Sequence, residues 1–513
     1  MTGFPTQLAT IPDADRPYLD VGSGHVSRIT GVSDEDMPLI VELFRVWRKK
    51  YPRNLIRSSY YDAHERFKDF GISIPSKIKA RAEAMIGWPA KAVRSLADLS
   101  TFQGFAFRGD DAFGVNDLVD SNELDVEMSE AITSAYTHSC AFLTVTADED
   151  DATRMRITPR SADWSAALWD NTRRQILAAL TITSADKNGR ITSFNVWLPG
   201  RIYVCTRDWG AWAATRIDTY YPEVNVVPLA YDAHLNRPFG RSRISRTLMS
   251  LTDIGFRTIM RMEASAEFYS VPKLWFLGAD KSAFSSDTWS SLISAINAIS
   301  KDEDGDKPEI KQISQASMQP HGDMLKTIAL LVSSETNLPI SDLGIVTENP
   351  TSAEAMAAAE RKLSREADRQ NIRFGRAIKR AVIMSICLRD GLVDAPDNLR
   401  TITPLWAPTR EVSDASRADY YAKLAAVNSS FASSDVGMMK AGLSPSEIES
   451  LHAYEQKIQA QQTIQQLKDK TLQADVKPEN AHGTEESAGH ELARSKDAGT
   501  AEAAQPGTQR LQN

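Results

Sequence analysis

Residues 236–272 read NRPFGRSRISRTLMSLTDIGFRTIMRMEASAEFYSVP, and this stretch decides the fold. After Pro238 and Gly240 the sequence keeps a helical pattern for about 30 residues, until Pro272 stops it. Its apolar side chains form one broad face, and they are Ile244, Leu248, Leu251, Ile254, Ile259, Met262, Ala266 and Tyr269. At roughly 1.5 Å per residue such a helix extends about 45 Å, which is long for a globular domain. We therefore expect a long amphipathic helix near the centre of the chain.

The residues before this helix predict a mixed α+β region. Acidic residues 33–36 precede an apolar helical series that ends at basic residues 48–50, which is typical of a capped amphipathic helix. Further helices are predicted over 76–86 and 124–138, and the second of these leads into a strand-like run, Cys140–Ala147.

Between about residues 154 and 219 the apolar residues recur at every second position, which is the pattern of a β-strand. Turn residues at 186–189 and 199–200 supply the tight reversals that antiparallel strands need. The predicted strands are 154–158, 176–183, 191–198, 201–206 and 213–219. Together these features predict an antiparallel meander packed with helices, an α+β domain.

The residues after the long helix alternate between short strands and helices. A strand is predicted over 273–277, then a helix near 286–299, an acidic polar loop over 301–308 and another extended piece. Helices follow over 323–337, 352–388 and 443–472. In residues 473–513 the only aliphatic side chains larger than Ala are Val476, Leu492 and Leu511, so this tail is predicted to be disordered.

Length and composition describe an ordinary water-exposed protein of several domains. A chain of 513 residues is too long to fold around one compact core. No apolar run approaches the roughly 18–20 residues that cross a bilayer. Three cysteines, far apart, argue against a disulfide framework and indicate a reducing compartment such as the cytoplasm. The net charge of −8 argues against tight, static binding to DNA phosphates, but it suits a conduit through which DNA moves.

Several short motifs, taken in order, resemble the portal proteins of tailed bacteriophages, in particular those of siphophages and actinobacteriophages. Residues 236–244 (NRPFGRSRI) are similar to the family's Gly-x-Ser-x-Ile entry to the first stem helix. Residues 263–278 (EASAEFYSVPKLWFLG) resemble the end of that helix and the start of the clip. Residues 349–355 (NPTSAEA) resemble the turn that opens the helix after the tunnel loop, and residues 60–64 with Trp88 and Val93 resemble the start of the wing. The likeness covers roughly residues 35–470.

The resemblance implies a portal fold with an α/β wing, a two-helix stem, a small α/β clip, a long crossing helix and a helical crown. The implied segments are a wing at 1–236, stem helices at 237–270 and 321–338, a clip at 271–320, a tunnel loop at 339–352, a long helix with the rest of the wing at 353–404, a crown at 405–472 and the tail at 473–513.

The resemblance also implies partners. It implies a homo-oligomeric ring of twelve copies at one capsid vertex of the virion, assembled in the host cytoplasm, with no membrane. Double-stranded DNA would pass through this ring during packaging and ejection. Terminase, a head–tail connector or adaptor, and the major capsid and scaffolding proteins would dock on it. The chain has no G-x-x-x-x-G-K-[S/T] phosphate loop, which is consistent with a separate packaging ATPase.

Family resemblance places the tunnel loop in the narrowest part of the channel. It comprises Ile340, Ser341, Asp342, Leu343, Gly344, Ile345, Val346, Thr347, Glu348 and Asn349. The loop contains no Lys or Arg, so it would touch DNA without pairing with phosphates. Some members of the family carry a lysine here. The alternative is an ordinary connection between two helices, which Pro339 and Pro350 alone would produce.

A row of arginines is the most ordered charge pattern in the chain, and we call it the basic stripe: Arg361, Arg365, Arg369, Arg373, Arg376 and Arg380. At about 100° per residue the six fall within about 120° of one helix face. They could pair with acidic surfaces of a neighbouring subunit or with DNA phosphates. The alternative is a solvated face with local pairs to Glu360, Glu366 and Asp368.

No catalytic or metal-binding motif is complete, so we expect no enzyme, no cofactor and no metal ion. Acidic residues 302–306 fit the first positions of an EF-hand, but Lys307 replaces the turn glycine and Ile313 the bidentate glutamate. A solvated loop is favoured there over a looser metal site. Cys205 is interpreted as a small buried hydrophobe rather than a nucleophile. The alternative function is a metal-dependent nuclease whose carboxylates are dispersed in the sequence.

Overall fold

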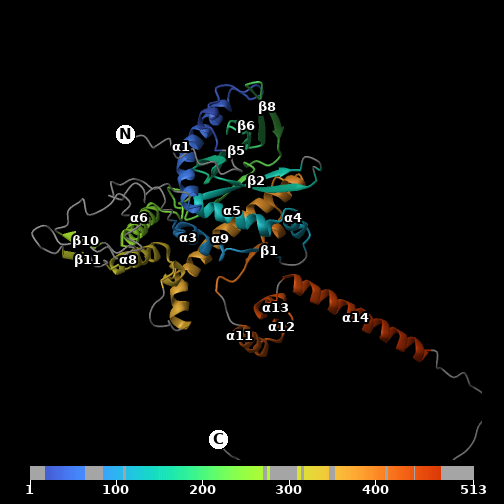
Figure 1. The fold of residues 1–513 in the computed structure, drawn as a ribbon. Helices are drawn as coiled ribbons and strands as arrows, with labels where there is room; N and C mark the ends of the chain where they lie inside the picture. The colour runs from blue at the N-terminus through green and yellow to red at the C-terminus, as the bar shows by residue number, and fades with distance from the viewer. Residues whose placement is uncertain are drawn as a thin grey trace, which may run out of the picture. The chain divides into compact units, whose positions relative to one another are not determined.

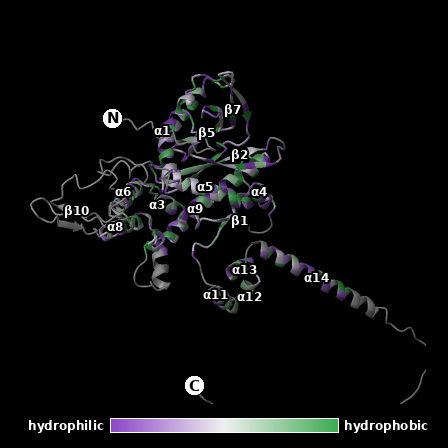
Figure 2. Ribbon diagram, in the orientation of Figure 1, coloured by the Kyte–Doolittle hydropathy of each residue, from purple (hydrophilic) through white to green (hydrophobic). Residues whose placement is uncertain are grey.

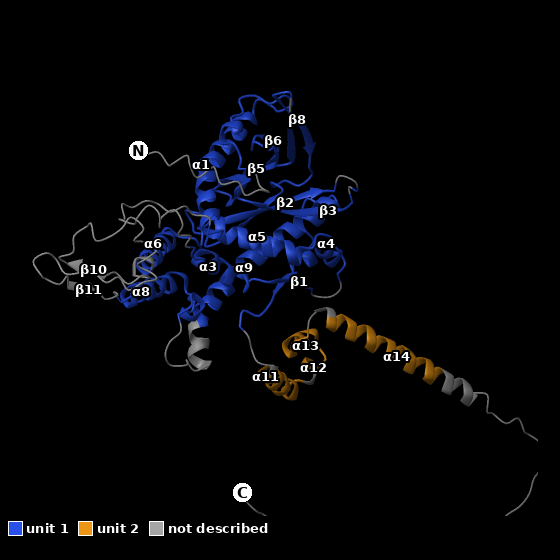
Figure 3. Ribbon diagram, viewed as in Figure 1, with its two compact units in different colours: residues 1–411 blue, residues 412–513 orange. Residues whose placement is uncertain are grey.

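The structure, a computed structural model, describes residues 18–63, 85–107, 111–148, 151, 153–269, 274–277, 309–312, 317–345, 353–410, 414–443 and 445–474. The predicted helix at 76–86, the predicted helix at 286–299, the acidic loop at 301–308 and nearly all of the predicted tail lie outside these residues. The chain divides into two compact units, residues 1–411 and residues 412–513 (Figure 3).

In the first unit, helix α1 (Met37–Tyr61) packs on a five-stranded sheet (Figure 1). Its buried side chains include Ile40, Leu43 and Trp47, at the spacing of one helical face, and they pack with the sheet in one core cluster. The predicted acidic cap is wrong in its detail. The Asp36 carboxylate makes no cap hydrogen bond and instead forms an ion pair with Arg201 of the sheet, Oδ1 to Nη2, at 2.5 Å.

The five-stranded sheet, in the order β4-β5-β6-β7-β8, contains four of the five strands of the predicted antiparallel meander. Its strands are β4 (Ser165–Asp170), β5 (Gln175–Ala185), β6 (Ile191–Leu198), β7 (Arg201–Asp208) and β8 (Ala211–Asp218). The predicted first strand, 154–158, belongs to a different sheet, and β4 takes its place here. The predicted turn between β5 and β6 is confirmed. Gly189 has φ +76°, and a Cβ there would lie 1.8 Å from the Tyr18 carbonyl oxygen, so only glycine fits.

A three-stranded sheet, in the order β3-β2-β9, separates two layers of the first unit. It comprises β2 (Cys140–Ala147), β3 (Met155–Ser161) and β9 (Val226–Ala230). Alternate residues of β2 face opposite ways, because Ala141, Leu143 and Val145 join one core cluster and Cys140 and Phe142 another.

Two helices cover the face of this sheet to which Leu143 points. They are α5 (Leu124–His138), which has its predicted bounds, and α9 (Ala353–Arg389), which was predicted over 352–388. The end of α9 beside β2 is hydrophobic in Figure 2. The remaining elements of this layer are α3 (Trp88–Ala97), α4 (Val115–Ser121), α10 (Asp397–Arg400) and the two-stranded sheet of β1 (Phe102–Ala106) with β12 (Thr403–Trp406). The short η2 (Val21–Gly24) lies in the other layer, against α1.

Helices α6 (Arg246–Tyr269) and α8 (Gln319–Thr336) pack against each other. They correspond to the predicted long helix after Gly240 and to the shorter helix predicted over 323–337. Helix α6 begins about five residues later than its pattern indicated. Ser242 and Arg243 form hydrogen bonds with the end of α5 instead, from Ser242 Oγ to the Thr137 carbonyl and from the Arg243 N–H to the Tyr136 carbonyl. Short strands β10 (Leu274–Leu277) and β11 (Glu309–Gln312) pair beyond α6.

The second unit is helical throughout its described residues. It contains α11 (Asp414–Val427), α12 (Ser429–Ala432), α13 (Asp435–Ala441) and α14 (Pro445–Ala474). The predicted helix over 443–472 is confirmed as α14, and among its described side chains only that of Ile448 is buried. None of the helices that the structure describes is long and apolar enough to span a bilayer.

Candidate functional site

A buried arginine joins the elements that meet where α6 begins. The guanidinium of Arg243 is 4% exposed, and it is held in the short segment between β9 and α6. Its Nε donates to the Ala92 carbonyl of α3 at 2.5 Å, and its Nη2 donates to the Thr336 carbonyl at the end of α8 at 2.6 Å. Arginine suits this position because its planar fork offers five donors in fixed directions. One side chain therefore ties the start of α6 to the end of α8.

The counter-ion of Arg243 is Glu366 in the middle of α9. Arg243 Nη1 donates to Glu366 Oε1 at 2.7 Å, and the Tyr231 hydroxyl donates to the same oxygen. Burial raises the pKa of Tyr231 well above its usual range, so this hydroxyl keeps its proton and remains a donor. The second oxygen, Oε2, accepts a hydrogen bond from Asn337 Nδ2 at 3.2 Å. We call this group of Arg243, Glu366, Tyr231 and Asn337 the junction. Its charges are paired and hydrogen-bonded, as buried ions require.

The junction also fixes the exit of the chain from α8. Asn337 has φ +57° and ends the helix, and Ser333 Oγ donates to the Leu338 carbonyl at 2.6 Å. The Leu338 side chain is 2% exposed. The backbone that enters the predicted tunnel loop at Pro339 is therefore anchored to buried groups on both α8 and α9.

The first half of the predicted tunnel loop is ordered as a turn against this anchor. Residues Ile340–Leu343 form a 3-10 helix, η4, and Gly344 follows with φ +80°. The Asp342 carboxylate lies 3.9 Å from the Lys91 ammonium of α3, and Leu343 packs on the main core cluster. Residues Val346, Thr347, Glu348 and Asn349 lie outside the described residues. Whether the loop lines a channel stays a prediction.

The basic stripe lies along an outward face of α9. The side chains of Arg361, Arg365, Arg369, Arg373 and Arg376 are exposed, and that of Arg380 is partly exposed. Arg373 Nη1 donates to the Ala233 carbonyl at 3.1 Å, and Arg380 Nη2 lies 2.6 Å from Glu223 Oε2. Within the ranges that the structure describes, no hydrogen bond or ion pair reaches Arg361, Arg365, Arg369 or Arg376.

Among the described residues, the local ion pairs proposed for this stripe do not form at Glu360, Glu366 or Asp368. Glu366 points away from the stripe to Arg243, and Asp368 Oδ1 accepts a hydrogen bond from Thr409 Oγ1 at 2.7 Å. The role of Glu366 was not predicted, because helical spacing alone places it beside Arg365 and Arg369. The available signal was Arg243, a charged residue directly before the buried Ile244.

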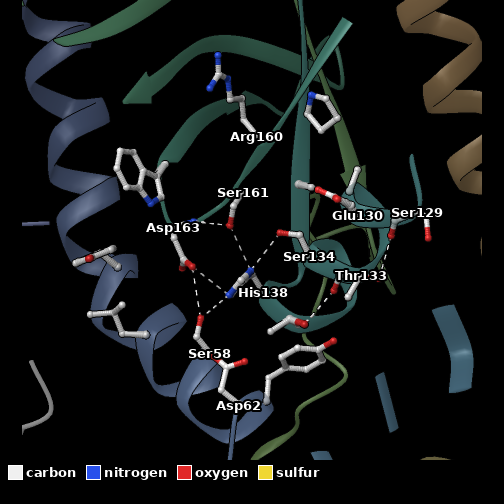
Figure 4. A pocket seen from close by; sticks show the side chains of 18 of the residues that line it. Ser58, Asp62, Ser129, Glu130, Thr133, Ser134, His138, Arg160, Ser161 and Asp163 are labelled. Atoms are coloured by element: carbon white, nitrogen blue, oxygen red, sulfur yellow. Dashed lines mark hydrogen bonds and ion pairs between the residues drawn. The ribbon is translucent and has the colours of Figure 1, made fainter. Parts of the chain in front are cut away.

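A separate pocket of about 550 Å³ opens between α1, α5 and β3, and it contains a buried histidine (Figure 4). Ser58 Oγ lies 2.9 Å from His138 Nε2, and Asp163 Oδ2 lies 3.2 Å from the same nitrogen. Burial lowers the pKa of His138 below its usual range. On the other ring nitrogen, Nδ1, Ser134 Oγ lies at 3.3 Å and Ser161 Oγ at 3.5 Å, so both nitrogens of this buried ring have hydrogen-bond partners.

The described part of the chain contains no assembled site for metal binding or for a reactive thiol. No group of three or more His, Cys, Asp or Glu side chains that could hold a metal ion occurs among those residues. Cys205 is fully buried, and burial raises its pKa to about 12, so the interpretation as a buried hydrophobe is confirmed. The predicted metal alternative at residues 302–306 lies outside the described residues.

Residues 42–430 match the family described as "Phage portal protein, SPP1 Gp6-like". The portal proteins of Mycobacterium phages L5 and D29 are each 28% identical to the chain over 381 residues, which is 72% of this chain and 77% and 78% of theirs. Among solved structures, a native gene transfer agent virion matches with TM-score 0.39 and 14% identity, covering 69% of this chain and 89% of the other. The neck of the native particle, computed with C12 symmetry, matches with TM-score 0.41, 13% identity and the same coverage.

Proposed function

Because the chain belongs to the SPP1 Gp6-like phage portal protein family, we propose that twelve copies form a ring around a channel for double-stranded DNA at one capsid vertex. The family match, which spans about three-quarters of the chain, is the observation that carries this proposal. The portal is a structural component, and nothing in the described residues favours the alternative of a metal-dependent nuclease. The ring would conduct DNA into the capsid during packaging and out of it during ejection.

The long helices support assembly into a ring. Helix α8 exposes Leu330 and Leu331, which are 43% and 52% exposed, and α9 exposes Ile372 at 58%. Large apolar side chains on the same elements as a row of unpaired charges are typical of a surface that a further copy covers. A cyclic ring uses one such surface on each side of every subunit.

The junction at Arg243 supports a mechanical role for the tunnel loop. A loop that senses or steadies a moving duplex needs a rigid root, and the exit from α8 is held by buried bonds to α9 and α3. The first half of the loop carries no positive charge, so it would touch phosphates without holding them. In this arrangement residues 340–349 line the constriction, residues 271–320 form the clip on which terminase and the connector dock, and residues 405–472 form the crown.

The test is the assembly state of the purified chain. Twelve copies of the 56.7-kDa chain weigh about 680 kDa, which size-exclusion chromatography with light scattering resolves from a monomer. We expect particles of that mass and, by negative-stain imaging, rings with a central hole. A stable monomer at micromolar concentration, with no larger species, would contradict the proposal.

A further inference from the structure

Helix α5 and its N-cap residue carry a row of carboxylates that we call the acidic row: Glu123 at the N-cap, and Glu127 and Glu130 in the helix. Their spacing of four and three residues places them on one helix face over about 10 Å. Glu123 and Glu130 are exposed and Glu127 is partly exposed. Within the described ranges no ion pair or side-chain hydrogen bond reaches any of the three. Burial, and then the charges of Glu130 and Glu123, raise the pKa of Glu127, which is consistent with carboxylates that lack a counter-ion.

The unpaired part of the basic stripe has matching dimensions. Arg361, Arg365 and Arg369 are four residues apart, so they form a row about 12 Å long on one face of α9. Each row also has an exposed aliphatic neighbour. Val126 beside the acidic row is 56% exposed, and Ile372 beside the basic stripe is 58% exposed. Two rows of opposite charge and similar length, each with an apolar flank, have the composition of two halves of one interface.

The two rows lie at opposite edges of the three-stranded sheet. The acidic row adjoins edge strand β3, because Glu127 and Glu130 line the same pocket as Arg160 of that strand. The basic stripe adjoins the other edge strand, β9, because Arg373 and Arg380 bind residues that directly follow and precede it. Strand β2 lies between them. One subunit therefore presents the rows on two different sides.

We propose that the acidic row of one subunit docks on the basic stripe of the next copy around the ring. This inference rests on the proposed function, because a ring brings the β3 edge of each subunit against the β9 edge of its neighbour. A head-to-tail contact between two different patches is the kind that closes into rings. Charged groups that attract across such a contact also fix its register and reject wrong orientations.

DNA is the competing partner for the basic stripe. A phosphate backbone would need the arginines but not the acidic row, and a neighbouring subunit needs both. The acidic row repels DNA, so DNA cannot be its partner. The neighbouring subunit therefore accounts for both rows with one contact, and DNA accounts for one row only.

The experiment uses two charge-reversed variants of the full chain. The first carries Arg365→Glu and Arg369→Glu, and the second carries Glu127→Arg and Glu130→Arg. We expect each variant alone to stay folded by circular dichroism and to lose assembly, because its own two rows then repel. Mixed in equal amounts, the two variants should assemble again. In an alternating ring every contact pairs opposite charges, once as in the wild type and once with both signs reversed.

The control reverses two exposed cations at the turn between β5 and β6, Lys187→Glu and Arg190→Glu, which changes the net charge by the same amount as the first variant. It should assemble like the wild type. Assembly is measured by light scattering and imaging, as rings or open arcs. Wild-type protein that never assembles would refute the proposed function itself. Wild-type rings together with assembling single variants, or with a mixture that does not recover, would refute the docking of the two rows and leave DNA as the partner of the stripe.

Discussion

Arg243 Nη1 lies 2.7 Å from Glu366 Oε1, and the two residues, which are 123 positions apart in the sequence, form a buried ion pair between the start of α6 and the middle of α9. The pair is nearly closed to water, with side chains 4% and 14% exposed. Each additional bond of the pair reaches another element, so the pair joins α3, α8 and α9 at one point. This point is the root of residues 340–349, which we propose to be the tunnel loop.

The first prediction concerns this pair. Arg243→Met leaves the Glu366 carboxylate buried without its counter-ion, which costs about 3–5 kcal/mol of unfolding free energy. Urea denaturation of the variant and the wild type measures the loss. The control is Arg380→Met, which breaks the more exposed pair with Glu223 and should cost about 0–1 kcal/mol. Similar losses in the two variants would show that the junction is no more important to folding than a surface ion pair.

The second prediction concerns the loop that this junction anchors. Asp342→Lys or Glu348→Lys would place a ring of added cations at the constriction, where they would pair with passing phosphates and add friction. We expect normal rings by imaging and a lower yield of nuclease-protected DNA in packaging. Asp342→Asn is the matched control, since it removes a charge without adding a cation. Packaging at the wild-type level by both lysine variants would show that the loop does not line the constriction.

The third prediction concerns the C-terminal residues. Removing 475–513, directly after α14, takes away only three aliphatic side chains larger than Ala. Ring assembly and the melting temperature should stay almost unchanged, because so few apolar groups cannot contribute a core. An insoluble truncated chain, or a loss of several degrees in melting temperature, would contradict this expectation.

The fourth prediction concerns pH. Burial lowers the pKa of His138 in the folded protein, so the unfolded chain binds this proton more readily. The stability that the neutral His138 imidazole contributes is fully present above roughly pH 6.5. It is lost as the pH falls from there toward the lowered pKa of the folded protein. The melting temperature of His138→Gln should therefore change less between pH 7.5 and 5.5, taken as about one unit on either side of the usual His pKa.

The fifth prediction concerns the thiols. All three cysteines are buried, and burial raises the pKa of Cys140 to about 11 and that of Cys205 to about 12. Thiols of this kind carry almost no thiolate near pH 8 and are shielded from reagents. Iodoacetamide should label none of them in the native protein and all three in denaturant, as mass spectrometry would show. Rapid labelling of the folded chain would mean that β2, β7 or α9 opens readily.

Local periodicity was sufficient for much of the fold. Helix α5 and strands β2 and β6 have their predicted bounds, because an uninterrupted apolar period between turn residues fixes both the type and the length of an element. The shorter strands β1, β4 and β9 were not predicted, since five or six residues carry too little period to distinguish a strand from a loop. The start of α6 was misplaced because Ser242 and Arg243 form tertiary hydrogen bonds in place of helical ones.

The sequence by itself determined that the chain is an α+β protein with long central helices, and its ordered motifs indicated the portal family. It also determined the basic stripe, because that pattern depends only on spacing along one helix. The tertiary structure decided which charges are paired. Glu366 stands beside the stripe in sequence, yet packing turns it inward to Arg243, which no spacing rule relates to it. Burial makes such a pairing obligatory, and burial is a property of the folded chain rather than of any local segment.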